Sequence, residues 1–221
     1  MDYHIIALDY RGFGDSSSVA PSEEGLVADV KVVFLYLHEK AGKSPLFVWG
    51  HSLGTGVACH ALSELCQEGK CPQGLVLEAP FNNLHDEIKL NPLSRVFYSL
   101  PYFDWAFIDP IRDSGNEFKS DIHVTHISCP MLISTRKMTP WCLCNSGERH
   151  GGHMALAKHN EGEGSQRKSE TLYKAAQKAR VSGAMPVTYV EVLAKYGCGH
   201  LDIPRAPEFT STIRLHTLTY S

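Results

Sequence analysis

Short apolar runs alternate with amphipathic stretches along most of this 221-residue chain. A few apolar residues bounded by turn-forming residues are typical of a buried strand, whereas apolar positions at steps of three and four are typical of a helix. The predicted strands lie at residues 4–8, 46–49, 75–77, 130–133 and 187–193, and helices are predicted between the first three strands at residues 22–41 and 53–66. This alternation predicts an α/β fold with a parallel sheet and helices on both faces.

The first predicted helix has the clearest boundaries. Its apolar positions, which recur at helical spacing, are Leu26, Val30, Val33, Phe34 and Leu37. Glu23 and Glu24 lie in its first turn, where negative charge favours the positive end of the helix dipole. We therefore predict a helix that begins at about Ser22 and is ended by Gly42.

Residues 82–128 interrupt the alternation with aromatic residues and prolines. The residues in question are Pro92, Phe97, Tyr98, Pro101, Tyr102, Phe103, Trp105 and Phe107. Two interpretations stay open: ordinary helices that pack their aromatics inward, or a cap whose apolar side chains line a slot for an acyl chain. We describe residues 82–128 as a cap region within a single domain over residues 1–221.

Composition and charge narrow the class of protein. With 43% hydrophobic residues and a net charge of −3, the chain is typical of a soluble globular protein. Its scattered basic residues give no indication of nucleic-acid binding or of a polybasic membrane patch. The chain has no apolar run of about eighteen residues and no charged-then-apolar leader, so no membrane span or secretion signal is expected in it. The seven cysteines follow no regular spacing, and we predict buried or reduced thiols without disulfides.

The residues around Ser52 carry the clearest chemical signal. The sequence Gly50-His51-Ser52-Leu53-Gly54 follows a predicted strand and precedes a predicted helix, which is the setting of a nucleophile elbow. Gly50 and Gly54 lack the Cβ atoms that would clash where strand and helix approach, so Ser52 can occupy a strained turn with its hydroxyl exposed. We predict Ser52 as a catalytic nucleophile and the Leu53 N–H as an oxyanion donor.

A serine nucleophile needs a base, because its hydroxyl is weak and imidazole titrates near neutrality. In α/β-hydrolases the histidine lies in the loop after the last strand, and His200 follows the predicted strand at residues 187–193. We predict His200 as the base. His51 is expected to shape the turn instead, since adjacent side chains there point away from each other.

Other charged residues are interpreted as structural. Asp9 and Arg11 are expected to hold together the loop after the first predicted strand, with Arg11 paired locally. Glu78 is expected to accept hydrogen bonds at the end of its strand, because this chemistry needs no second carboxylate beside the serine. Cys198 is expected to be a small packed residue.

These motifs together resemble the membrane-tethered α/β-hydrolase-domain lipases that cleave lysophosphatidylserine and monoacylglycerols. The segments that carry the resemblance are residues 9–16, 49–58 and 77–81, the pair Asp104-Trp105 and residues 126–130. The resemblance implies Ser52 as nucleophile, Leu53 as oxyanion donor and His200 as base. It also implies the endoplasmic reticulum membrane, to which family members are anchored by a helix before the catalytic domain; no such helix is expected in this chain.

Two departures from the family pattern stand out. The family has further strands, and a His-Gly loop with a second oxyanion donor, before the segment that matches Met1. Their absence predicts an N-terminally truncated sheet with unpaired backbone groups beside the strand that leads to Ser52. Family members also have an acidic turn after the strand equivalent to residues 130–133, and its aspartate orients the histidine. Here no such aspartate follows Ile133, so the catalytic acid is unassigned.

Residues 134–170 are therefore interpreted as aberrant and disordered. Codons can be chosen for residues 134–147 such that a shifted reading frame encodes HAEDDTVVPLQLG, the acidic turn that the family pattern predicts. Our hypothesis is that this segment is translated out of register, and the nucleotide sequence decides it. Asp202 and Glu191 are the candidate substitute acids, and neither position suits the role.

The same segment allows a zinc interpretation, which its spacing fits poorly. The soft ligands in question are Cys142, Cys144, His150 and His153. A C-x-C pair followed by H-x-x-H lacks the usual spacing of a zinc site. No metal or organic cofactor is therefore implied.

The sequence predicts a serine hydrolase that cleaves an acyl ester through an acyl-serine intermediate, and the resemblance narrows the substrate to a lysophospholipid or a monoacylglycerol. The alternative is a catalytically impaired fragment, or a non-catalytic protein that binds lipid or a partner. The missing acidic turn and oxyanion loop favour this alternative.

Overall fold

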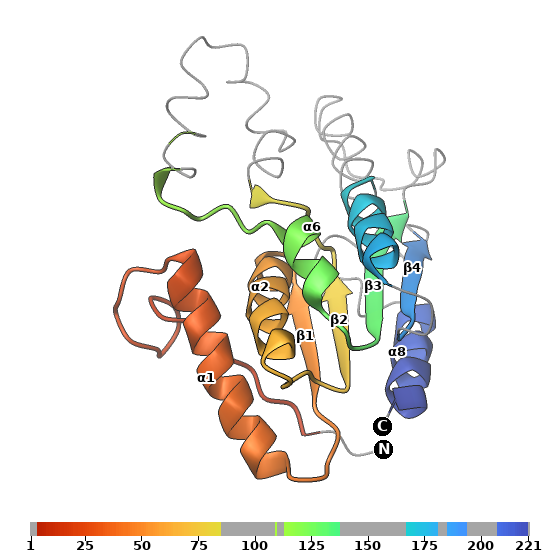
Figure 1. Ribbon diagram of the computed structural model, residues 1–221, viewed down its shortest axis with the longest axis horizontal. Coiled ribbons are helices and arrows are strands. Elements are labelled where there is room, and N and C mark those ends of the chain that lie inside the picture. The colour runs from red at the N-terminus through yellow and green to blue at the C-terminus, as the bar shows by residue number, and fades with distance from the viewer. Residues whose placement is uncertain are drawn as a thin grey trace, which may run out of the picture.

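The computed structural model describes residues 4–84, 109, 113–137, 167–180, 185–193 and 207–220. Within them, one parallel sheet has the strand order β1-β2-β3-β4 (Figure 1). The strands are β1 (Phe47–His51), β2 (Gly74–Glu78), β3 (Met131–Lys137) and β4 (Val187–Leu193). Because all pairings are parallel, the four carboxyl ends lie along the same edge of the sheet. The predicted α/β fold class is confirmed.

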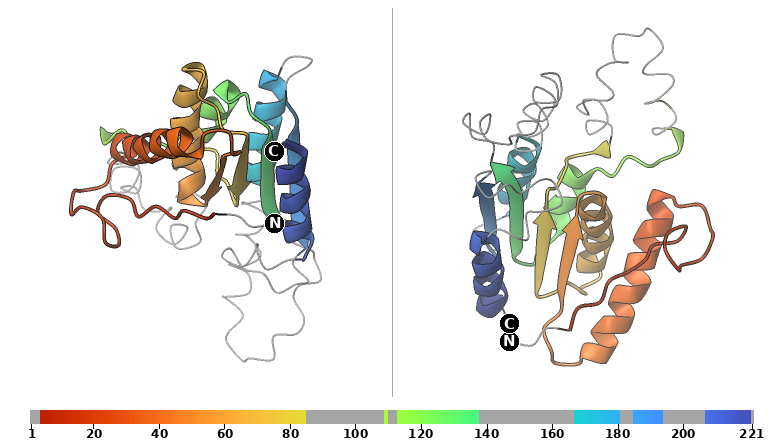
Figure 2. Two further views of the ribbon diagram at one scale, coloured as in Figure 1. Left: turned by 90° about the horizontal axis from the view of Figure 1, so that it is seen from below. Right: turned by 180° about the vertical axis from the view of Figure 1, so that it is seen from behind.

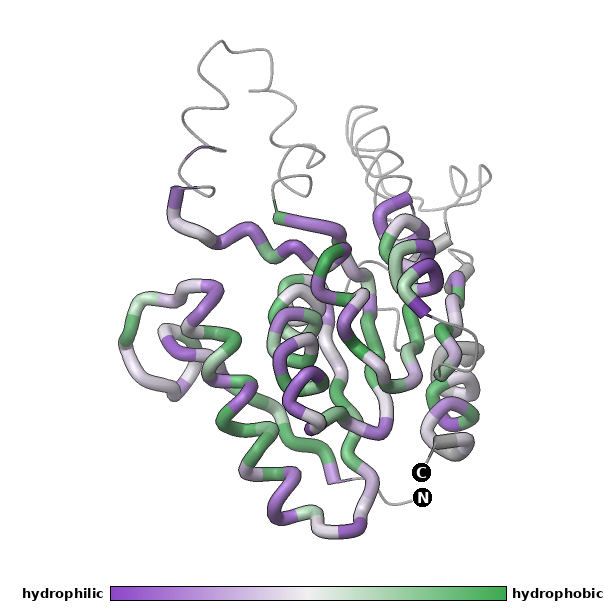
Figure 3. The backbone as a smooth tube through the Cα atoms, in the orientation of Figure 1, coloured by the Kyte–Doolittle hydropathy of each residue, from purple (hydrophilic) through white to green (hydrophobic). Residues whose placement is uncertain are grey.

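Helices pack on both faces of this sheet (Figure 2). On one face, α2 (Leu53–Gln67) and a helix over residues 167–179 bury Leu62 and Leu172 against the strands. On the opposite face, α8 (Pro207–Tyr220) packs Ile213 against Val76 and Leu132. The backbone trace in Figure 3 is coloured as hydrophobic along much of the strands, as expected for a sheet buried on both faces.

Helix α1 (Glu23–Ala41) confirms the predicted boundaries. The Ser22 hydroxyl accepts a hydrogen bond from Gly25 N at 3.2 Å, which caps the first turn. Gly42 follows the last turn with φ +58°, a conformation that favours glycine. Apolar residues of α1, among them Leu26 and Val27, pack with Val57 and Ala61 of α2.

The first predicted strand, residues 4–8, is wrong. These residues form no strand, and Ile5 and Ile6 are 89% and 59% exposed. A strand needs a neighbour to accept and donate its backbone hydrogen bonds, and no described strand lies beside residues 4–8. β1 is an edge strand of the described sheet, in keeping with the unpaired backbone groups predicted beside it.

The segment expected to be aberrant is ordered at both ends. β3 continues past Ile133 to Lys137, and its last four residues pair with β4 from Val190 to Leu193. Ser134 and Thr135 are fully buried there. At the other end, residues 167–170 belong to the helix that buries Leu172. Residues 138–166 lie outside the described residues, so their predicted disorder stays a prediction.

Only the ends of the cap region are described. α6 (Ser120–His123) and η2 (Val124–His126) lie near the C-terminal end of this region and pack against α2. The aromatic residues between positions 92 and 107 lie outside the described residues, so both interpretations of them stay open. Of the helices that are described, none is both long and apolar enough to cross a membrane.

The cysteines only partly follow the prediction. Cys59 and Cys129 are buried thiols, and burial raises the pKa of each to about 12. The prediction of no disulfide is wrong, because Cys66 and Cys71 form one. The chain reverses at Gly69 just after α2, where Lys70 N donates to Leu65 O at 2.8 Å, and this turn brings the two cysteines together.

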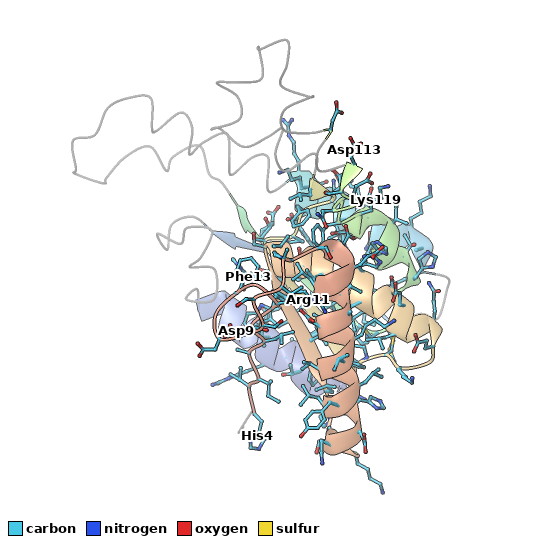
Figure 4. The ribbon with its side chains drawn as sticks, turned by 90° about the vertical axis from the view of Figure 1, so that its left-hand side faces the viewer. His4, Asp9, Arg11, Phe13, Asp113 and Lys119 are labelled. Atoms are coloured by element: carbon cyan, nitrogen blue, oxygen red, sulfur yellow. A yellow bond between two sulfur atoms is a disulfide. The ribbon has the colours of Figure 1, made fainter. Side chains whose placement is uncertain are left out.

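The loop before α1 is fixed by an ion pair. The sequence suggested that Arg11 pairs within its own loop, but Arg11 lies against α1 (Figure 4). It pairs there with Asp29 through Nε and Nη2, at 3.0 and 2.6 Å from the carboxylate. Gly25 makes room for this crossing, since a Cβ there would lie 2.9 Å from Arg11 Cδ. Asp9 does act inside the loop, where its carboxylate lies against Gly14.

The Arg11–Asp29 pair predicts a pH-dependent contribution to stability. The hydrogen bond from Arg11 is the main reason why the pKa of Asp29 lies below its ordinary value. A lowered pKa in the folded state gives stabilisation that is present above the unfolded pKa of about 4 and is lost as pH falls through the folded pKa. Asp29→Asn should therefore lower the melting temperature at pH 7, and its difference from wild type should shrink below about pH 4.

Thermal unfolding between pH 2 and pH 8 measures this effect, with Asp15→Asn as the matched control on an exposed carboxyl of the same loop. A difference between wild type and Asp29→Asn that stays constant down to pH 2 would contradict the assignment.

Candidate active site

Ser52 occupies a strained turn between β1 and α2. Its backbone has φ 49° and ψ −117°, a region that residues with a Cβ rarely adopt. Hydrogen bonds hold this turn from both sides. Ser52 N donates to Glu78 O at 3.0 Å, and the backbone N and hydroxyl of Thr55 both donate to Ser52 O, at 2.9 and 2.6 Å. The turn is thus tied to the end of β2 and to the first turn of α2.

The Ser52 hydroxyl is not used to cap the helix. Ser52 is the N-cap of α2, yet its side chain makes no capping hydrogen bond. Ser52 is half-buried, and Leu53 is 38% exposed. Because the first N–H groups of a helix have no intrahelical partner, the Leu53 N–H is available at the positive end of α2. The turn therefore places a hydroxyl beside a helix N-terminus, as the sequence motif predicts.

The two glycines of the motif have different roles. A Cβ on Gly50 would lie 2.5 Å from Gly54 O and 2.8 Å from Gly54 C, so only glycine fits there. Among the described residues, a Cβ on Gly54 would meet only the Tyr10 hydroxyl, at an ordinary 3.6 Å. The expectation that both glycines avoid a clash holds for Gly50 and is wrong for Gly54. Of the two positions, only Gly50 is one where a Cβ would point into the backbone of the helix.

Glu78 supports the turn from the next strand. Its side chain is 2% exposed and accepts a hydrogen bond from Trp49 Nε1 at 3.1 Å, while its carbonyl oxygen accepts one from Ser52 N. Burial raises the pKa of Glu78, and His51, its partner in the register of β1 and β2, opposes that rise. Glu78 is thus a structural acceptor at its strand end, as the sequence predicts.

The sequence motifs did not indicate the roles of three neighbours of the Ser52 turn. The Thr55 hydroxyl bonds Ser52 O, and a threonine three residues after an N-cap is a signal that could have indicated this contact. The Tyr10 hydroxyl lies beside Gly54, and burial raises its pKa. Ala79 has φ 50° at the end of β2, and its N donates to Ser134 O. The positions of Tyr10 and Ala79 depend on tertiary contacts and have no local signal.

The structure describes only some of the remaining predicted site residues. His200 and Asp202 lie outside the described residues. The described part of β4 ends at the same edge of the sheet as Ser52, and His200 follows it in the sequence. Glu191 lies on β4, opposite Thr135 in the register with β3. Cys198 and the four ligands of the zinc interpretation, Cys142, Cys144, His150 and His153, also lie outside the described residues.

Comparison with protein families identifies the scaffold. Residues 1–114, about half of the chain, match the family described as serine aminopeptidase, S33. The chain belongs to this family of α/β-hydrolases. The matched residues include β1, the Ser52 turn, α2 and β2, so the family match covers the whole described part of the candidate site.

Curated relatives of this chain support the same family assignment. The chain is 36% identical over 214 residues to the lysophosphatidylserine lipase ABHD12 of Xenopus tropicalis, covering 97% of this chain and 50% of that protein. It is 46% identical over 133 residues to the Danio rerio protein of the same name, covering 60% of this chain and 35% of that protein. The chain spans about half the length of the curated relatives it matches over most of its own length.

Solved structures share the fold of this chain. An α/β-hydrolase from Vibrio vulnificus superposes with a TM-score of 0.62 at 20% identity, covering 94% of this chain and 61% of that chain. An esterase from Pyrococcus furiosus superposes with a TM-score of 0.56 at 16% identity, covering 96% and 68%. At these identities the likeness concerns the fold.

Proposed function

We propose that this hydrolase cleaves acyl esters of lysophospholipids or monoacylglycerols through an acyl-serine intermediate formed on Ser52. The observation that carries the proposal is the strained backbone of Ser52, whose hydroxyl makes no capping hydrogen bond at the N-terminus of α2. Strain of this kind persists only where the surrounding structure enforces it, and it clusters at functional sites. Gly50 and the hydrogen bond from Ser52 N to Glu78 O provide that enforcement.

In the proposed mechanism, His200 takes the Ser52 proton as the hydroxyl oxygen attacks the ester carbonyl. The Leu53 N–H donates to the oxygen of the tetrahedral intermediate, where negative charge develops. His200 then returns the proton to the leaving alcohol and leaves an acyl group on Ser52. A water molecule, activated by the same imidazole, releases the acid and restores the serine.

The substrate class in this proposal comes from the relatives. Several of them carry the name lysophosphatidylserine lipase, so a single-chain lipid ester is the substrate that the family likeness supports. We propose the endoplasmic reticulum membrane as the location on the same likeness. Fractionation of expressing cells tests it, and recovery of the protein away from that membrane would contradict it.

A second candidate function is a hydrolase scaffold without catalytic activity that binds lipid or a partner. The observation that favours it is β3, which continues through Ser134–Lys137 where the family pattern has an acidic turn. An unsupported imidazole is a weaker base, because a carboxylate normally fixes its tautomer and orientation. The two functions differ in whether Ser52 reacts.

Fluorophosphonate labelling of the purified full chain separates the two functions. The hydrolase should carry the probe on the peptide that contains Ser52, and heat denaturation before labelling should abolish the signal. Release of fatty acid from lysophosphatidylserine, monoolein and a short-chain ester then ranks the substrates. Labelled protein that prefers the short-chain ester would overturn the lipid assignment, whereas unlabelled native protein would favour the scaffold.

A further inference from the structure

A second polar cluster lies two helical turns along α2 from the Ser52 turn. Glu23 at the start of α1, His60 of α2 and His123 of α6 can each offer one ligand atom, and these atoms lie within 4.8 Å of one another. Glu23 is only 6% exposed, although it lies in the first turn of a helix. Three separate elements therefore bring a buried carboxylate and two imidazoles together.

The Glu23 carboxylate is held in position by two hydrogen bonds. Oε1 lies 2.7 Å from His60 Nδ1, and Oε2 accepts from Phe118 N at 2.7 Å. Burial alone would raise the pKa of Glu23, but the bonds from His60 and Phe118 outweigh it and hold the pKa below its ordinary value. The carboxylate is thus an ionised, oriented oxygen donor.

A hydrogen-bond chain fixes the orientation of His123. The Ser63 hydroxyl donates to His60 O at 2.7 Å, so its oxygen accepts from His123 Nδ1–H at 3.2 Å. This assignment of the tautomer follows from the hydrogen-bond network and leaves the lone pair on His123 Nε2. Metal-ligating histidines commonly donate their other ring N–H to a polar group in this way. Burial and the neighbouring His60 lower the pKa of His123, which favours its neutral form.

We propose that Glu23, His60 and His123 form a binding site for a divalent transition-metal ion of the zinc type. One carboxylate oxygen and two imidazole nitrogens are a donor set that zinc uses, with a water molecule as the fourth ligand. The ion replaces the proton between Glu23 and His60. The two rings stack at 3.9 Å with an interplanar angle of 17°, so one imidazole turns about χ2 to direct its lone pair at the shared ion.

The proposed ion would connect α1, α2 and α6, the elements that supply the three ligands. Its expected consequence is stabilisation of the fold, since a ligand that binds the folded state raises the melting temperature. Esterase chemistry at Ser52 needs no metal, so this site is independent of the proposed function. Each proposal can fail without the other.

Calorimetric titration of the full chain with zinc chloride tests the site. The titration uses a Cys142→Ser, Cys144→Ser background, which removes the two cysteine ligands of the other candidate zinc segment. Within it, His123→Gln is compared with His126→Gln, which removes an exposed histidine three residues away. Circular dichroism first establishes that each variant is folded, and Ser63→Ala replaces His123→Gln if that variant does not fold.

The background protein and His126→Gln should each bind one zinc ion, and zinc should raise both melting temperatures. His123→Gln should lose that rise and bind at least about tenfold more weakly, and Ser63→Ala should weaken binding by about tenfold. Cobalt substitution should give a spectrum without a thiolate charge-transfer band. No zinc binding in the background protein, or equal affinity in the His123→Gln variant, would overturn the proposal.

Discussion

Ser52→Ala is expected to remove fluorophosphonate labelling completely and to lower ester turnover by about 10⁴-fold or more. The reason is that the acyl-serine intermediate cannot form without the hydroxyl, and the remaining N–H donors stabilise only a direct attack by water. The fold should be unchanged, because the Ser52 hydroxyl makes no capping hydrogen bond to α2. Steady-state hydrolysis and thermal unfolding of the same preparation measure both parts of the prediction.

Two further variants make this test specific. Ser44→Ala changes an exposed serine in the turn before β1 and should keep full labelling. Ser52→Gly should be as inactive as Ser52→Ala but more stable by about 1 kcal/mol, because glycine adopts φ 49° without strain. Labelling that persists in Ser52→Ala would assign the reaction to another residue and refute the proposed nucleophile.

Gly50→Ala is expected to destabilise the fold by about 3 kcal/mol or to prevent folding. The new methyl group would lie 2.5 Å from Gly54 O and 2.9 Å from Thr55 Cα, and both are backbone atoms that cannot rotate away. The strand and the helix must therefore separate, which also displaces the Ser52 turn. Urea unfolding measures the loss of stability, and labelling of the folded fraction measures the loss of the site.

Gly54→Ala is the matched control for this effect. Within the described part of the chain, its methyl group would meet only the Tyr10 hydroxyl, at 3.6 Å. Alanine is also a better helix former than glycine. Stability should change by less than about 1 kcal/mol. Equal destabilisation by the two substitutions would show that the close approach at Gly50 does not determine the geometry of the turn.

Local signals predicted most of the elements correctly. The helical spacing from Leu26 to Leu37, with Ser22 before it and Gly42 after it, gave the limits of α1 because capping depends on adjacent residues. The apolar run at residues 187–193 coincides with β4. The motif around Ser52 also predicted a strained turn between a strand and a helix, since the glycine that permits the turn lies within the motif itself.

Contacts between distant residues were not predictable in the same way. Residues 4–8 have the composition of a strand but no described strand beside them, and hydrogen bonding in a sheet depends on the neighbour. Ser134 and Thr135 have no strand signal, yet pairing with β4 places them in β3. The same limit applies to Arg11, whose partner Asp29 lies on the next helix.

The sequence by itself determined the order of α1, α2 and the four described strands, and the serine turn, because each depends on patterns of adjacent residues. The alternation of strands with helices also indicated a parallel sheet. Only the tertiary structure decided that Glu78 holds the Ser52 turn, that Cys66 and Cys71 join, and that Glu23 meets His60 and His123. These contacts connect residues from separate elements or across a chain reversal. Their distances are set by how the elements pack, and no local pattern encodes them.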